Sequence, residues 1–493
     1  MSELLHWDLS NVYSGLESTE YDAAVASIKD QVAETDKMLS EAISAPLHHA
    51  GSLAAVLGEA ITRINQLIVD LRTHGAYINS FVSTDSRNMT ARTRLSEFER
   101  VSVEFNALDT RFTQWVGSLG DVLEEAIPMN EVTEQHAFIL RETAEQAKYL
   151  MSEAEERLAS ELSLSGGNAF AKLQGTVVSQ LTAPFEVDGE VKNLPMTALI
   201  NMKTHPDEKV RRRAWETENA AWKTVEEPLA FAMNGVKGET ITLNKHRGRT
   251  DPLHAPLDFA RMDRATLDAM LEAMHDSFPM FRRYWHAKAR LIGKDRLAWW
   301  DLSAPVGSLD KVYSWDETRG FILENFCTFS PDLAAWAGRA FDENWMDVPP
   351  REGKRAGAFC MGLPGVRESR ILLNFDGSLD QVSTVAHELG HGWHNECIYQ
   401  AGTTQLNAQT PMTLAETASI MCETIVMQAV LGRAENVQQE LGILETQLQS
   451  ESQVIVDIYS RYLFESAVFE KRATAEISAA DLNEMMLSAQ KAT

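Results

Sequence analysis

Hydrophobic positions in the first third of the chain recur at the three-to-four-residue spacing of amphipathic helices. The clearest runs begin at Tyr21 and Leu53, and similar runs cover residues 89–126 and 131–162. These patterns predict four long helices joined by short connections, which favours antiparallel packing. The helical runs end at a break rich in Ser and Gly, residues 163–168.

After this break the hydrophobic pattern becomes typical of short strands. Residues 176–178 and 184–187 predict strands, and Asp188-Gly189 is typical of a tight hairpin turn. The change from helical to strand spacing marks a domain boundary, which we place at about residue 170.

The rest of the chain is again mostly helical, with an extended piece at Leu297–Leu302 and two short strands, Gly357–Met361 and Ile371–Phe375. The helical spacing is found over residues 195–200, 206–245, 264–292, 315–342, 379–396, 413–474 and 478–491. We therefore expect a mainly α protein: a multi-helix body with a small β-sheet. The predicted division is an N-terminal helical domain, residues 1–170, and a second domain, residues 171–493.

The strongest chemical signal is an H-E-x-x-H motif at His387, Glu388 and His391. Two histidines four residues apart lie on one face of a helix and can bind one metal ion. The intervening glutamate can then hold a metal-bound water and accept its proton. Ser378 and Gln381 predict an N-terminal capping box for this helix.

Two glycines, Gly390 and Gly392, lie within this predicted helix although glycine is a poor helix former. Small residues beside a metal would allow another segment to approach closely. The alternative to a metal site is accidental spacing, but two histidines framing a glutamate in this register favour the metal.

A catalytic zinc usually has three protein ligands and one water, so a third ligand is needed. Glu396 is too close along the same helix, and His394 is expected to contact a ligand or the substrate. Glu416 begins a separate helix that can pack across the first, and we choose it as the third ligand. Glu423, two turns further on, could hydrogen-bond a ligand histidine and fix its tautomer. The alternative for Glu423 is a solvated helix face.

The strand Gly357–Met361 precedes the predicted metal helix in the sequence. An edge strand in this place could bind an extended peptide by β-augmentation. It could equally be one half of a structural hairpin, and both interpretations remain open.

The composition excludes several classes of partner. A net charge of −26 and a pI of about 4.9, without a long basic run, argue against binding nucleic acid or anionic membranes.

The four cysteines form no C-x-x-C pair, which fits a reducing compartment. The N-terminus lacks a signal-peptide pattern and no run of 18 apolar residues occurs, so we expect a cytoplasmic protein. The sequence does not predict an oligomeric state.

Several motifs together resemble the M3 family of zinc metallopeptidases, in particular its oligoendopeptidase F branch. The resemblance runs along nearly the whole chain, and the motifs stand in the family's order: Trp7-Asp8-Leu9-Ser10, Trp299-Trp300-Asp301-Leu302, Gly353–Cys360, Ile371–Phe375, Ala386–His391 and Ala415–Ser419.

The resemblance implies a zinc-dependent endopeptidase with one Zn²⁺ per chain and short unfolded peptides as substrates. It also implies a helical body split by a deep substrate channel, in which an edge strand holds the substrate backbone. The residues that it implies are the zinc ligands His387, His391 and Glu416, the general base Glu388, and the strand residues Gly357, Ala358 and Phe359.

One departure from the family concerns the C-terminus. Family members continue into a segment rich in His and Tyr that hydrogen-bonds the reaction intermediate, whereas this chain ends at Thr493. We therefore expect a catalytic domain that is incomplete at its C-terminus. The alternative function is a zinc-binding but inactive subunit for peptide binding or assembly, or half of a split peptidase.

Overall fold

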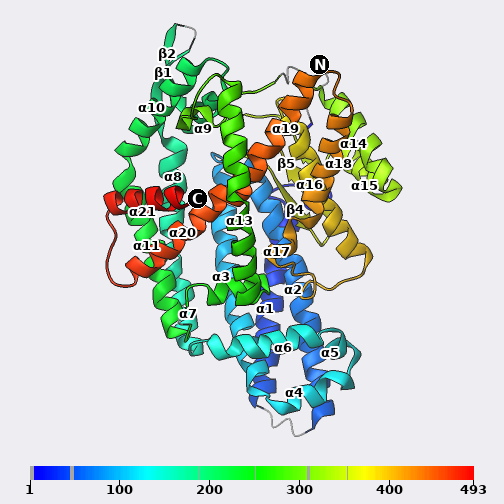
Figure 1. Ribbon diagram of the computed structural model, residues 1–493. Coiled ribbons are helices and arrows are strands. Elements are labelled where there is room, and N and C mark those ends of the chain that lie inside the picture. Colours follow the sequence, from blue (N-terminus) through cyan, green and yellow to red (C-terminus); the bar gives the residue numbers. More distant parts are fainter. Residues whose placement is uncertain (1–4, 45–48, 188, 250, 308–310, 352) are drawn as a thin grey trace. The chain divides into compact units, whose positions relative to one another are not determined.

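The computed structural model describes residues 5–44, 49–187, 189–249, 251–307, 311–351 and 353–493 (Figure 1). The protein is mostly helical, at 72%, and its described residues form two small sheets, which confirms the predicted fold class. Contacts divide the chain into two compact units, both of them discontinuous. Unit 1 consists of residues 1–157 and 311–430, and unit 2 of residues 158–310 and 431–493. The boundary predicted at residue 170 concerns domains of continuous sequence, and it stays a prediction.

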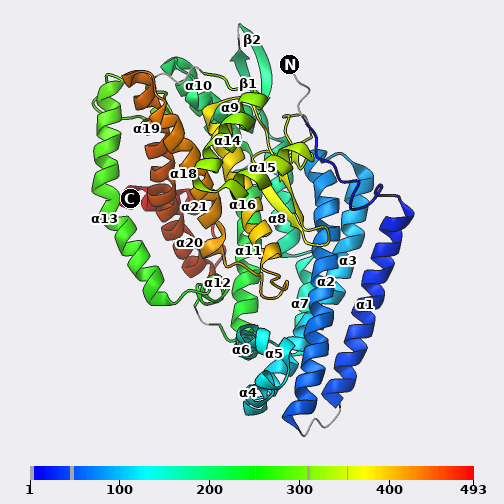
Figure 2. The same cartoon turned by 90° about the vertical axis from the view of Figure 1, so that its right-hand side faces the viewer.

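Three long helices form the N-terminal part of unit 1 and lie side by side (Figure 2): α1 (Thr19–Ser44), α2 (Ala50–Thr84) and α3 (Met89–Ser118). Their apolar stripes face one another and form one core, in which Leu39, Leu57 and Ile64 are fully buried. The Asn88 side chain caps α3 by accepting a hydrogen bond from the Ala91 N–H at 3.0 Å. Hydrophobic spacing therefore predicted these helices correctly.

The end of the predicted third helix and all of the predicted fourth are instead a series of short pieces. Gly120 adopts a positive φ of 54°, which residues with a Cβ rarely adopt, and the chain leaves the preceding helix there. The Asn130 side chain then caps the start of a new helix by accepting a hydrogen bond from the Val132 N–H at 2.8 Å. The pieces are α4 (Asp121–Ala126), η1 (Ile127–Met129), α5 (Glu131–Gln135), α6 (Ala137–Gln146), η2 (Ala147–Tyr149) and α7 (Glu153–Ser163).

The second part of unit 1 packs helices against a three-stranded sheet. The sheet has the order β3-β5-β4, so β4 is an edge strand that pairs only with β5, in antiparallel register. The buried side chains of β5 and of the helix that follows it share one core, which includes Ile371, Val385 and Leu389. The elements are α14 (Trp315–Phe329), α15 (Pro331–Asp342), β3 (Met346–Asp347), β4 (Phe359–Leu363), β5 (Glu368–Leu372), α16 (Leu379–Gln400), α17 (Met412–Ala415) and α18 (Thr417–Gly432).

Unit 2 contains the predicted hairpin, formed by β1 (Thr182–Val187) and β2 (Glu190–Pro195). Gly189 has the positive φ of 81° that such a turn requires, whereas Asp188 lies outside the described residues. The predicted strand at residues 176–178 was wrong, because this segment belongs to a helix, α8 (Gly167–Gln180).

Two tertiary contacts explain that helix. The Gly167 N–H donates to the Glu239 carboxylate at 2.5 Å, which caps the helix start. Phe170 lies so close to Gly235 that a Cβ there would be 2.3 Å from its ring. Packing against the neighbouring helix thus outweighs the β preference of the Thr-Val-Val run.

The extended piece predicted at Leu297–Leu302 was also wrong, since Trp299–Asp301 forms a short 3₁₀ helix, η4. The buried Asp301 carboxylate accepts from Arg211 at 3.0 Å and from Lys294 at 2.6 Å, and this fixed carboxylate curls the local backbone. The remaining elements of unit 2 are α9 (Met196–Asn201), η3 (Met202–Thr204), α10 (Glu208–Thr224), α11 (Glu226–His246), α12 (His254–Ala260), α13 (Arg264–Leu291), α19 (Val437–Ser452), the π-helical turn η5 (Gln453–Asp457), α20 (Ile458–Arg472) and α21 (Ala479–Ala492).

Two helical segments are long and apolar enough to cross a membrane by length and composition: Ala50–Thr84 and Met412–Gly432. Half of the first segment's most apolar window is buried inside unit 1, where it forms the centre of the helical core. The second carries Glu416 and Glu423. Core helices of globular proteins pass the same test.

Candidate metal centre

Helix α16 carries the H-E-x-x-H motif and begins as the sequence predicts. The Ser378 hydroxyl accepts a hydrogen bond from the Gln381 N–H at 3.3 Å. The reciprocal half of the capping box is absent from the described contacts, because Asp376 accepts from the Ser378 N–H at 2.9 Å instead. This start fixes the rotation of α16, so that His387 and His391 project from one face with their ring centroids 5.0 Å apart.

Glu416 lies between α17 and α18 and meets both histidines. Its Oε2 atom is 3.2 Å from His387 Nε2 and 3.3 Å from His391 Nε2. The potential ligand atoms of the three residues all lie within 4.8 Å of one another. The structure therefore brings together the three residues that the sequence analysis chose as metal ligands.

The spacing of these atoms fits zinc. Tetrahedral zinc with bonds of about 2.0–2.1 Å to nitrogen and oxygen places its ligand atoms roughly 3.3 Å apart. The two distances from Glu416 Oε2, 3.2 and 3.3 Å, have this value. Two imidazoles and one carboxylate are also a donor set that catalytic zinc uses.

Glu423 fixes the orientation of His387. Its Oε2 atom lies 3.2 Å from His387 Nδ1, which leaves Nε2 directed at Glu416. The hydrogen bond to Glu423 raises the pKa of His387, whereas burial lowers the pKa of His391. A carboxylate on the far nitrogen selects the tautomer whose Nε2 lone pair is free for a metal.

Ser419 is a site residue that the sequence analysis missed. Its hydroxyl is fully buried and donates to Glu416 Oε2 at 2.7 Å. The hydroxyl also lies 3.0 Å from the Glu416 backbone carbonyl. One sequence signal could have identified Ser419. It follows Glu416 by three residues, a spacing that places the two side chains on one face of a helix.

Gly390 allows α18 to reach the histidines. A Cβ atom on Gly390 would lie 2.5 Å from the Ala418 carbonyl oxygen and 2.5 Å from Ser419 Cα. Both are backbone atoms that a side-chain rotation cannot move. Gly392 has a similar role on the opposite side of α16, where a Cβ would meet the Trp336 ring at 2.4 Å. The close approach that the sequence suggested is thus present at both glycines.

Glu388 is buried, with 6% of its surface exposed, and its Oε2 atom has no hydrogen-bond partner among the described residues. Burial raises the pKa of Glu388 to about 7. An unpartnered buried carboxylate is costly, and a side chain of this kind beside a metal-ligand set is a candidate proton acceptor.

The other predicted site residues lie nearby. His394 is half-buried on α16 and makes no hydrogen bond within the described parts of the chain. Phe359 begins the edge strand β4, and Ala358 packs against the core beneath it. The Gly357 carbonyl accepts a hydrogen bond from Asn374 Nδ2 at 2.8 Å, which uses one of its two lone pairs, and its contact with a peptide stays a prediction.

Comparison with known proteins agrees with this geometry. Residues 201–483 match the profile of Peptidase family M3, and residues 120–182 match that of Oligopeptidase F. The chain belongs to peptidase family M3. Enzymes of this family are metallopeptidases, and the protein is accordingly a peptidase of this metal-dependent class.

Some relatives in the family are distant in sequence but match most of the chain. Group B oligopeptidase PepB of Streptococcus agalactiae is 22% identical over 461 residues, covering 90% of this chain and 72% of that protein. An oligoendopeptidase F homolog of Lactococcus lactis is 21% identical, covering 97% and 78%. A solved structure of a protein from Chlamydophila abortus shares the fold, with a TM-score of 0.73 at 16% identity, covering 99% of this chain and 81% of that one.

Proposed function

We propose that the protein is a zinc-dependent endopeptidase that hydrolyses short unfolded oligopeptides. One observation carries this proposal: Glu416 Oε2 lies 3.2 and 3.3 Å from the two histidine Nε2 atoms. The buried, unpartnered Glu388 is adjacent in sequence to the first of these histidines. The names of the relatives, oligopeptidase and oligoendopeptidase F, support short peptides as the substrate class.

His387, His391 and Glu416 would hold one Zn²⁺ per chain. Zinc bound there would supply a Lewis acid that polarises the scissile carbonyl and acidifies a water. Glu388 would accept the proton of the attacking water and deliver it to the leaving amine. Its pKa of about 7 suits a group that must both take and return a proton near neutral pH.

The surrounding residues would position this machinery. Glu423 keeps His387 in the tautomer that can bind a metal, and Ser419 holds the Glu416 carboxylate. The edge strand β4 would align the substrate backbone, beginning at Phe359. The deep channel implied by the family resemblance remains a prediction, and we propose a cytoplasmic location.

The test is cleavage of a quenched fluorescent peptide of about ten residues, before and after chelation and zinc re-addition. We expect cleavage that disappears with the chelator and returns with zinc. Glu388→Gln should lower kcat by about 10²–10⁴-fold, because it removes the proton acceptor, and should leave the zinc content unchanged.

Glu396→Gln is the matched control, since Glu396 lies on the same helix and is hydrogen-bonded to Gln400 rather than to the site. Its activity should equal that of the wild type. A protein that holds zinc and cleaves no peptide would contradict the proposal and favour an inactive peptide-binding subunit.

A further inference from the structure

A second feature of unit 1 is a cavity of about 460 Å³ enclosed by α2, β4, α16 and the loop that follows α16. Twelve residues line it, among them one arginine and neither Asp nor Glu. Acidic residues make up 71 of the 493 positions, so a lining that contains an arginine and no carboxylate is unusual in this acidic protein.

The cavity presents hydrogen-bond donors without an anionic partner. The Arg72 Nη1 atom donates to Gln405 Oε1 at 3.2 Å, which holds the guanidinium in place. Among the described residues, the side-chain contact of Arg72 is this amide and no carboxylate, and the Tyr399 hydroxyl makes no hydrogen bond. Burial raises the pKa of Tyr399, so its phenol remains a neutral O–H donor. A guanidinium next to a free hydroxyl is suited to a carboxylate.

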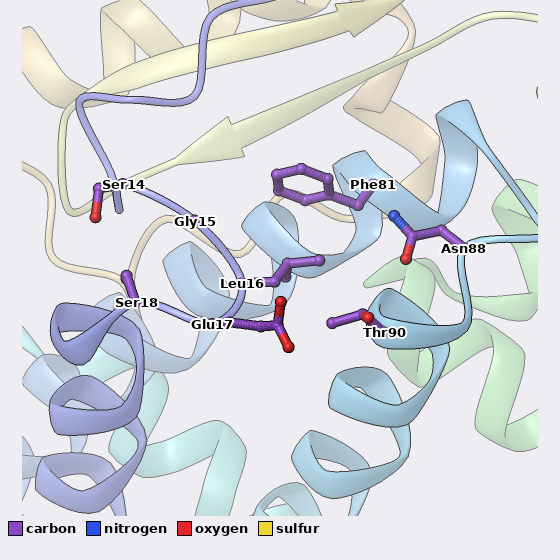
Figure 3. A pocket seen from close by; sticks show the side chains of 8 residues that line it. All are labelled: Ser14, Gly15, Leu16, Glu17, Ser18, Phe81, Asn88 and Thr90. Atoms are coloured by element: carbon purple, nitrogen blue, oxygen red, sulfur yellow. The ribbon is translucent and has the colours of Figure 1, made fainter.

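A cavity of similar size elsewhere in unit 1 lacks these properties. It measures about 470 Å³ and is lined by residues such as Glu17, Asn88 and Thr90 (Figure 3). The Asn88 side chain is occupied as the cap of α3, and the Ser18 hydroxyl accepts from the Tyr21 N–H at 3.2 Å. It offers a carboxylate and no cationic side chain, so nothing there selects an anion.

The donor-lined cavity lies on the same helix as the candidate metal ligands. Asn395 and Ile398 line it and follow His391 by four and seven residues, so they continue the same face of α16. Strand β4 passes so close that a Cβ on Gly362 would lie 3.0 Å from the Tyr399 hydroxyl. At ~1.5 Å per residue, the cavity begins roughly 6–12 Å from His391 along the helix.

We propose that this cavity binds a carboxylate of the peptide substrate, held by Arg72 and Tyr399. The inference rests on the proposed peptidase function. An extended peptide rises ~3.3 Å per residue, so the carboxylate belongs about two to four residues from the cleaved bond. The carboxylate can be an acidic side chain or the C-terminus of the peptide, since both present the same group to the guanidinium.

Two matched pairs of peptides distinguish these sources. In the first pair, a free C-terminus is compared with a C-terminal amide; in the second, Glu is compared with Gln at each position two to four residues from the cleaved bond. We expect one pair to differ by about 10-fold or more in KM, with the carboxylate form preferred. The pair that differs identifies the source, and equal KM values within both pairs would overturn the proposal.

Variants then assign the preference to the cavity. Arg72→Met should raise KM for the carboxylate peptide by about 10–100-fold and leave its neutral counterpart and kcat unchanged, and Tyr399→Phe should have a smaller effect in the same direction. Arg92→Met, an exposed position on α3, is the matched control. An equal loss for both peptides would show a merely structural role.

Binding separates this inference from the proposed function. The Glu388→Gln protein is mixed with fluorescent carboxylate and neutral peptides, and fluorescence polarisation gives each Kd without turnover. Preference for the carboxylate peptide that disappears with Arg72→Met supports the cavity even if cleavage is never observed. Cleavage of neutral and carboxylate peptides alike, with equal Kd values, would overturn the cavity proposal and leave the peptidase intact.

Discussion

At the scale of single residues, His74 is an ionisable group that the fold buries outside the candidate site. It is fully buried on α2, with ring centroids 4.6 Å from Tyr21 and 5.3 Å from Phe98. Its Nε2 atom has no hydrogen-bond partner within the described residues. Burial in this aromatic cluster lowers the pKa of His74 to about 4.

This lowered pKa predicts a pH dependence of stability. In the unfolded chain His74 binds a proton below pH ~6.5, whereas in the folded chain it does so only below about 4. The unfolded state therefore gains stability as the pH falls through this window. The free energy of unfolding should drop by up to about 3 kcal/mol between pH ~6.5 and 4.

Urea unfolding followed by circular dichroism at several pH values measures this loss, and His74→Phe should reduce it. His275→Gln, at a side chain that is 63% exposed, should retain the wild-type dependence. If His74→Phe and the wild type lose the same stability between these pH values, the assignment to His74 is wrong.

Single residues of the site could be predicted where the chemistry is encoded in local spacing. His387, Glu388 and His391 form a motif within one helix, and Glu416 stands at the start of another. Ser419 could not be found in the same way. A serine in a helix ordinarily bonds its own backbone, and its bond to Glu416 depends on how the Glu416 side chain is turned.

At the scale of elements, the contact between α16 and α18 determines whether a third ligand reaches the histidines. We expect Gly390→Ala to weaken zinc binding by about 10–100-fold, because the new Cβ would meet the backbone of α18 and displace Glu416. Alanine is the better helix former by ~1 kcal/mol, so a loss could not come from α16 itself. Competition with a chromophoric chelator measures the affinity.

The matched control is Gly320→Ala within α14, where a Cβ would meet nothing within 4 Å. This variant should keep the wild-type zinc affinity. Unchanged affinity in Gly390→Ala would show that α18 can shift without moving its carboxylate away.

Elements could be predicted where hydrophobic spacing is long and regular, as in α2 and α13. Prediction failed where distant contacts decide the local conformation. The Thr-Val-Val run at residues 176–178 is helical because α8 packs on α11, and residues 299–301 curl around a carboxylate held by two cations. Glu239, Gly235 and Arg211 lie more than 60 residues away in sequence from the segments they hold, so local patterns contain no record of these contacts.

At the scale of the whole molecule, all candidate zinc ligands belong to unit 1. Removing zinc should therefore destabilise α16 and α18 and leave unit 2 unaffected. At a zinc concentration 100 times the Kd, binding stabilises the folded state by about 2.7 kcal/mol. Hydrogen exchange of amides in residues 379–432 should become faster by up to about 100-fold after chelation.

Amides of α13 in unit 2 provide the internal control and should exchange at the same rate with and without zinc. His391→Ala, which removes a ligand, should exchange like the chelated protein in both conditions. Equal changes in α13 and α16 would show that the two units do not respond separately to the metal.

The organisation into units was only partly predictable. The sequence shows a change of hydrophobic pattern near residue 170, which lies close to the change of unit at residue 158. The return of the chain to unit 1 at residue 311 leaves no comparable mark. Which helices share a core depends on long-range packing, and amphipathic spacing identifies a buried face without identifying its partner.

The discontinuous course of unit 1 has a consequence for synthesis on the ribosome. Its N-terminal helices emerge first, but the unit cannot close until Val430 has been made, roughly 270 residues after Arg157. At ~5–20 residues per second this interval lasts on the order of 15–55 s. For most of it, the apolar core of α1–α3 lacks Leu406, which later joins it from the loop after α16, so the nascent chain exposes apolar surface to aggregation and to chaperones.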